Sequence, residues 1–107
     1  MKDFINKKGY FIIDINEVNG TYWLQDLEKI IINQIKPKVV KKRDVEVSWD
    51  YSEYEFDVEK DNIKFIVNLN DDTFCYFKLT ENITEESKQK LREWATIIAK
   101  EVEKLRR

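Results

Sequence analysis

The stretch that decides the fold runs from Tyr54 to Leu79 and reads Tyr-Glu-Phe-Asp-Val-Glu-Lys-Asp-Asn-Ile-Lys-Phe-Ile-Val-Asn-Leu-Asn-Asp-Asp-Thr-Phe-Cys-Tyr-Phe-Lys-Leu. Apolar and polar residues alternate through most of it. The alternation is interrupted at residues 60–62 and 70–72, which are rich in the Asn and Asp typical of turns. Alternation indicates strands with one buried face, and short turns join antiparallel neighbours. The stretch therefore predicts three consecutive antiparallel strands.

A further alternation precedes this stretch. Val45, Val47, Trp49 and Tyr51 share one face, and the phase then slips by one residue at Ser52 and Glu53. A slip of one residue moves every following side chain to the other face, so it predicts a bulge or a tight hairpin. We expect Trp49 to lie in the core. Residues 38–44 are interpreted as a basic connector that could begin this strand.

Two helices are expected around these strands. Residues 10–15 predict a largely buried strand, and Thr21 is a candidate N-cap for a helix from about residue 22 to residue 35, with Trp23 buried. Pro37 should end this helix, because the residue before a proline is pushed out of the α region. Thr84 should cap the final helix. Its apolar stripe consists of Leu91, Trp94, Ala95, Ile98, Val102 and Leu105.

These elements predict a two-layer α+β fold. One mostly antiparallel sheet of four to five strands, in the order β-α-β-β-β(-β)-α, is backed by two helices. The 107 residues are expected to form a single domain, residues 1–107, with residues 1–8 disordered or in a short helix. The stripe of the last helix should pack on one sheet face, which carries Val47, Trp49, Phe65, Val67, Phe77 and Leu79.

Charge is distributed unevenly along the chain. Residues 44–86 contain thirteen Asp or Glu and three Lys, a net charge of −10, whereas the segments before and after them each carry +4. The overall net charge of −2 therefore hides a basic–acidic–basic chain. Such an asymmetry bears on partners and on the rate of association rather than on fold.

The candidate partner-binding residues lie within the acidic segment. Glu53, Glu55, Asp57 and Glu59 alternate along a strand, so they should share one face, with Lys64 and Lys78 as the only cations expected there. Phe74 and Tyr76 are expected on the same face, and a charged rim around aromatic groups is typical of protein interfaces. Tyr54 is a third aromatic candidate, although its predicted face is the core. The alternative is a solvated outer face whose charges protect the sheet edges.

Catalytic and cofactor sites find little support. The chain has no His, one Cys and two well-separated Gly, which removes the common general base, the usual zinc ligand and any glycine-rich phosphate loop. We expect no metal and no cofactor, and we expect Cys75 to be a small buried hydrophobe. The net negative charge argues against nucleic acid as a partner. No apolar run has the length of a signal peptide or a membrane span, so we expect a cytoplasmic protein without a membrane partner.

The block from Trp49 to Asp57, Trp-Asp-Tyr-Ser-Glu-Tyr-Glu-Phe-Asp, together with the size, acidity and lack of His, resembles the immunity proteins that neutralise bacterial toxins. The resemblance concerns size, charge pattern and mixed α/β character, and it transfers no residue role. It implies a non-enzymatic inhibitor that binds a basic toxin, such as a nuclease, through an acidic surface. A homodimer or other homo-oligomer that pairs through a sheet edge or the C-terminal helix is the alternative, and a carboxylate-dependent metalloenzyme is a third.

Overall fold

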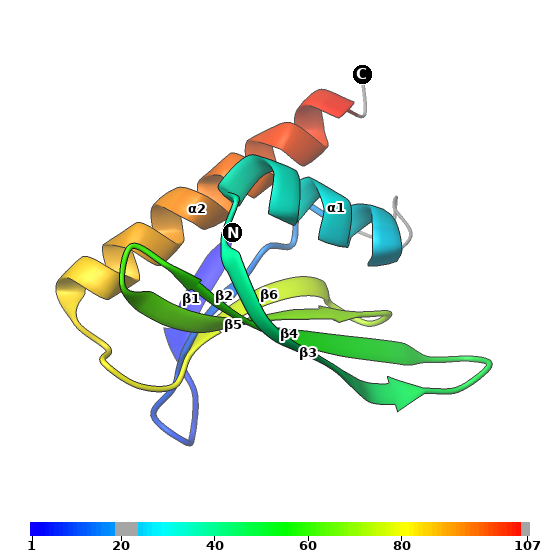
Figure 1. Cartoon of the computed structure of the whole chain (residues 1–107), viewed down its shortest axis with the longest axis horizontal. Coiled ribbons are helices and arrows are strands. Elements are labelled where there is room, and N and C mark those ends of the chain that lie inside the picture. Colours follow the sequence, from blue (N-terminus) through cyan, green and yellow to red (C-terminus); the bar gives the residue numbers. More distant parts are fainter. Residues whose placement is uncertain (19–23, 106–107) are drawn as a thin grey trace.

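A computed structural model describes residues 1–18 and 24–105 of the chain. Within them the two helices cover one face of a six-stranded sheet, and the other face is open (Figure 1). The predicted α+β architecture is thereby confirmed. In chain order the elements are β1 (Lys2–Ile5), β2 (Phe11–Asp14), α1 (Leu24–Ile35), β3 (Lys38–Val47), β4 (Ser52–Lys60), β5 (Ile63–Asn70), β6 (Phe74–Leu79) and α2 (Glu85–Leu105).

The strands lie in the order β1-β2-β6-β5-β4-β3, and every neighbouring pair is antiparallel. The sheet has six strands rather than four to five because Lys2–Ile5 pairs with β2, where disorder or a short helix was expected. The basic connector at residues 38–44 is also part of a strand, since β3 begins at Lys38. Four residues with two charges carry too weak an alternation to reveal an edge strand from sequence.

The turn between β4 and β5 explains how this hairpin closes without glycine. Lys60 pairs with Ile63, and both intervening residues, Asp61 and Asn62, have positive φ, 52° and 65°. Positive φ at both central residues is characteristic of the type I′ turn, whose twist matches that of the flanking strands, and Asp and Asn tolerate that conformation. The turn predicted at residues 60–62 is thus confirmed.

The apolar core lies between the helices and the inner sheet face. Phe65, Val67, Phe77 and Leu79 are buried there, as predicted, against the α2 stripe of Leu91, Ala95, Ile98 and Val102. Trp94 stacks on Phe65 with 5.4 Å between ring centroids. Leu105 was wrongly placed in this stripe. It is 52% exposed in the last turn of α2.

The phase slip in the sequence is a hairpin, and its end is not in the core. Val47 pairs with Ser52, and residues 48–51 form the loop between them. Val47 is 62% exposed and Trp49 is 97% exposed, so the predicted packing of both against α2 is wrong. Figure 1 shows the reason: the hairpin of β3 and β4 extends past the ends of both helices, so no second layer covers it.

The helix boundaries follow the predicted signals where they are described. The Ser87 backbone N–H donates to Thr84 Oγ1 at 3.1 Å, which confirms Thr84 as the cap of α2. Helix α1 ends at Ile35, and Lys36, the residue before Pro37, has left the helical region with a φ of 55°. The expectations for Thr21 and Trp23 lie outside the described residues.

Candidate protein interface

The acidic row lies on the open face of the sheet. Glu53, Glu55, Asp57 and Glu59 alternate along β4 with residues such as Phe56 and Val58, which are buried toward the helices. Their neighbours on β5 are Asn70, Asn68, Ile66 and Lys64, respectively. The predicted common face is therefore correct, and this face has no helix over it (Figure 1).

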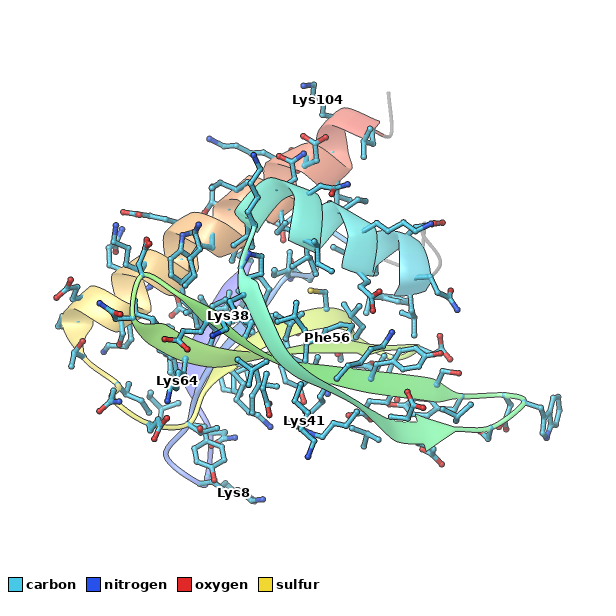
Figure 2. The ribbon with its side chains drawn as sticks, viewed as in Figure 1. Lys8, Lys38, Lys41, Phe56, Lys64 and Lys104 are labelled. Atoms are coloured by element: carbon cyan, nitrogen blue, oxygen red, sulfur yellow. The ribbon has the colours of Figure 1, made fainter. Side chains whose placement is uncertain are left out.

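The row is not short of positive charge, contrary to our expectation. Arg43 on β3 bonds Glu55 at 3.0 Å and Asp57 at 2.7 Å, and the Lys78 ammonium lies 3.6 Å from Glu55. Lys41 is the register neighbour of Asp57 and, as Figure 2 shows, points away from the helices. The error arose because residues 38–44 were interpreted as a connector. Once they form β3, their side chains must alternate between the two faces of the sheet.

A buried amide connects the carboxylates. Asn68 has no exposed surface, and its Nδ2 donates to Glu53 Oε2 at 2.8 Å and to Glu55 Oε2 at 2.9 Å. Its Oδ1 accepts from Asn70 Nδ2 at 2.8 Å. Buried polar groups need partners, and Asn68 has them through both ends of its amide. The sequence signal was an Asn within the apolar run of β5, but it does not say which carboxylates it would meet.

These contacts fix the ionisation of the central carboxylate. Burial of Glu55 opposes its charge, but the hydrogen bond from Asn68 and the charges of Lys78 and Arg43 outweigh burial and hold the pKa of Glu55 below its usual value. The Glu55 side chain is only 12% exposed. Glu55 and Asp57 therefore serve first to hold β3, β4 and β5 together.

The three aromatic candidates do not gather in one place. Tyr76 is the register neighbour of Asn68 on the open face, and burial, followed by the charges of Glu55 and Glu53, raises its pKa to about 12. Tyr54 packs against the core from the inner face, with Lys42 Nζ 5.6 Å from its ring centroid. Phe74 starts β6 with a φ of 69° and also packs against the core. Tyr76 alone of the three stays beside the acids.

A second group of carboxylates lies at the end of the sheet where the β3–β4 and β5–β6 turns meet. The two turns are joined because Asp71 Oδ2 accepts from the Ser52 backbone N–H at 2.7 Å. We call this group the acidic end. None of its carboxylates forms an ion pair with any residue in the described part of the chain. It consists of Glu46, Asp50, Glu53, Asp71 and Asp72.

The tyrosine at the acidic end reports the local charge. Desolvation, the hydrogen bond from its hydroxyl to Glu53 Oε1 at 2.9 Å and the charges of Glu53, Asp72 and Glu46 raise the pKa of Tyr51 to about 12. Three carboxylates from three different segments thus act on one hydroxyl. The negative potential of this end therefore comes from the tertiary structure and not from one run of the sequence.

The opposite end of the open face holds a surface groove of about 480 Å³. Figure 2 shows Lys38 and Lys64 on this side of the molecule. The charged residues that line the groove are Lys38, Arg43, Lys64, Asp57, Glu59 and Glu81. Three cations and three carboxylates give it no net charge, so it offers no selection between cationic and anionic partners.

The remaining chemical groups offer no assembled centre. Among the described residues, no three Cys, Asp or Glu side chains converge as ligands of a metal would. Cys75 is fully buried, as predicted, and burial raises the pKa of its thiol. Neither of the described helices combines the length and the apolar character needed to cross a bilayer.

No family model matches this sequence, and no curated protein or solved structure shows significant similarity to it.

Proposed function

We propose that this chain is a non-enzymatic protein-binding module, most concretely an immunity-type inhibitor that neutralises a basic bacterial toxin such as a nuclease. The single observation that carries the proposal is the acidic end. Five carboxylates from two adjacent turns and from the strand ends beside them lie there without ion-pair partners among the described residues. Clustered like charges repel one another, and a cationic partner relieves that repulsion while the field steers its approach.

The proposal shifts the contact surface along the acidic strand. Glu53 belongs to the acidic end, and Tyr76 supplies an aromatic group next to the ion-pair network. Glu55 and Asp57 act through the network, because Arg43 and Lys78 already neutralise them. Glu59 lies at the neutral groove and contributes little to recognition of a cationic partner.

The alternative of a homo-oligomer draws on the free edge of β3, a ten-residue strand whose side chains are almost all exposed. Two features of β3 oppose such pairing. Its register shifts twice, between Val39 and Lys41 and between Asp44 and Glu46, and its residues 38–43 include Lys38, Lys41, Lys42 and Arg43. Bulges and edge lysines are the means by which proteins keep sheet edges apart. This edge therefore favours the monomer.

The proposal is tested with a panel of purified basic bacterial nuclease toxin domains, using surface plasmon resonance. The parent should bind at least one domain, with an association rate that falls steeply as salt is raised. Glu46→Gln with Asp72→Asn should slow association severalfold and flatten the salt dependence, since neither side chain has a described bond to lose. Glu101→Gln with Glu103→Gln on α2 removes the same charge elsewhere and should have little effect. A parent that binds no domain of the panel would contradict the proposal.

A further inference from the structure

The side chain that most needs an explanation is Trp49. It is 97% exposed at the end of the β3–β4 hairpin, next to Val47 at 62% and close to Val45 at 52%. Large aromatic side chains are usually buried, and protein interfaces use them as anchors. No described residue makes a ring contact with Trp49. None of these three exposed side chains belongs to the apolar core.

The loop that carries Trp49 is ordered by its own hydrogen bonds. The Ser48 backbone N–H donates to the Tyr51 carbonyl at 2.8 Å and closes the loop. Ser48 Oγ lies 3.0 Å from both that carbonyl and Asp50 Oδ1, and the Tyr51 hydroxyl donates to Glu53. The adjoining strand is fastened to the β5–β6 turn through Ser52 and Asp71. The backbone on either side of Trp49 is therefore ordered before any partner arrives, which reduces the entropy lost on binding.

The surroundings of Trp49 select among the surfaces that could cover it. Asp50 is its chain neighbour, and the other carboxylates of the acidic end lie on the strands and turn beside the loop. Negative charge at this density repels nucleic acid, anionic bilayers and the same end of a second copy of this chain. A protein surface with an apolar pocket surrounded by Lys and Arg fits this site, because the pocket accepts the indole and the cations face the carboxylates around it. Such an interface has the usual anatomy of an apolar centre within a polar border.

We propose that Trp49 is the anchor of the interaction surface and enters an apolar pocket with a cationic rim on a protein partner. This inference rests on the proposed function and specifies its central contact. The two parts of the surface then have separable duties. The carboxylates of the acidic end govern how fast the partner arrives, and Trp49 governs how long it stays, because buried anchors act mainly on dissociation.

The experiment uses the full chain and any nuclease toxin domain from the panel that the parent binds. Trp49→Ala should weaken affinity by about thirtyfold or more, the range for an anchoring side chain, mainly through faster dissociation. Its association rate and the salt dependence of that rate should match the parent. Trp49→Phe should keep part of the affinity. Ile97→Ala, which truncates a 41% exposed apolar side chain on α2, is the matched control and should bind like the parent.

Each result separates this inference from the function on which it rests. If the parent binds and Trp49→Ala binds equally well, the anchor is wrong and the acidic interface stands. If no panel domain binds the parent, both fail. Two further measurements could also overturn the anchor: Trp49-dependent binding to phosphatidylcholine–phosphatidylglycerol vesicles would assign the side chain to a membrane, and a parent dimer lost in Trp49→Ala would assign it to a second copy. Thermal unfolding of Trp49→Ala should match that of the parent, so a loss of binding cannot be attributed to misfolding.

Discussion

Arg43 and Glu55 form an ion pair at 3.0 Å that ties the edge strand β3 to β4. Arg43 also holds Asp57, so one guanidinium spans two positions of the acidic row. No second layer of structure covers this sheet face, and the network helps to hold the strands together in its place. The edge strand is thus attached by side chains as well as by its backbone ladder.

The first prediction concerns this ion pair. Glu55→Gln should lower the free energy of unfolding by about 1.5–3 kcal/mol, the range for a hydrogen bond to a charged group. Glu59→Gln, two positions along the same row and without a described ion pair, should change it by less than about 0.5 kcal/mol. Urea unfolding measured by circular dichroism compares the two variants. Equal losses would show that the network contributes no more than any surface charge.

The pH dependence of stability follows from the same carboxylate. The pKa of Glu55 is lower in the folded chain than its ordinary value of 4.5, so the unfolded chain binds more protons as the pH falls below that value. The stability that Glu55 contributes is present above pH 4.5 and is lost as the pH falls through the folded pKa. The thermal unfolding temperature should therefore decrease as the pH is lowered below 4.5, and the decrease should be less steep in Glu55→Gln. Parallel curves for both proteins would contradict this assignment.

Alkaline pH should act through the tyrosines. Tyr51 and Tyr76 have folded pKa values of about 12 against an ordinary value of 10. Their contribution to stability is complete below pH 10 and is lost as the pH rises toward 12, because the unfolded chain releases these protons first. Absorbance at the tyrosinate band should show Tyr51 and Tyr76 titrating well above pH 10 in the folded parent. Tyr76→Phe should remove one of them.

Asn68 offers a sharper test of the buried amide. Asn68→Asp would replace a donor with a third carboxylate between Glu53 and Glu55, and the variant should be strongly destabilised at neutral pH. Acid should partly restore its stability relative to the parent, since protonation removes the repulsion. Asn68→Ala removes the donor without adding charge, and its deficit should lack this recovery in acid.

Two tryptophans with opposite surroundings form a matched pair. Trp94 is buried and stacked on Phe65, so Trp94→Ala should lower the free energy of unfolding by about 3–5 kcal/mol. Trp49→Ala should change it by no more than about 0.5 kcal/mol, because the side chain is exposed. Chemical denaturation measures both. A large loss in Trp49→Ala would mean that the hairpin loop belongs to the cooperative core.

The core could be predicted from the sequence because periodicity needs only local information. The two-residue alternation through Phe65, Val67 and Phe77 and the helical spacing of Leu91 and Ile98 each fix a face without knowledge of the neighbours. The prediction that Trp49 is buried was wrong, because alternation identifies one face of a strand but not where the helices that cover that face end. The hairpin passes beyond both helices, and only the tertiary structure shows this (Figure 1).

For the acidic row, too, the local pattern was predictable and the long-range contacts were not. Its common face followed from the period of a strand, whereas its charge balance depended on which strand lies next to β4. Arg43 is twelve residues from Glu55 in the chain. The stretch between them contains the phase slip, which is compatible with either a bulge or a tight hairpin, and only the hairpin brings Arg43 beside Glu55. The acidic end joins turns still farther apart in the sequence, through Ser52 and Asp71. Long-range pairing of this kind carries no local signature.

The reaction rate of Cys75, the single thiol, can be used to measure how often the core opens. It has no exposed surface, and burial raises the pKa of its thiol, so a disulfide reagent can react only when the sheet opens around β6. With reagent in excess and closing faster than labelling, the ratio of the observed rate to that of a free thiol equals the fraction of time the core is open. The same ratio can be measured in Glu55→Gln, which loosens the edge strand β3, and in Trp94→Ala, which destabilises the whole core. Comparison with the parent would show which of the two motions exposes Cys75. The same reaction would reveal whether a bound partner slows the opening motion.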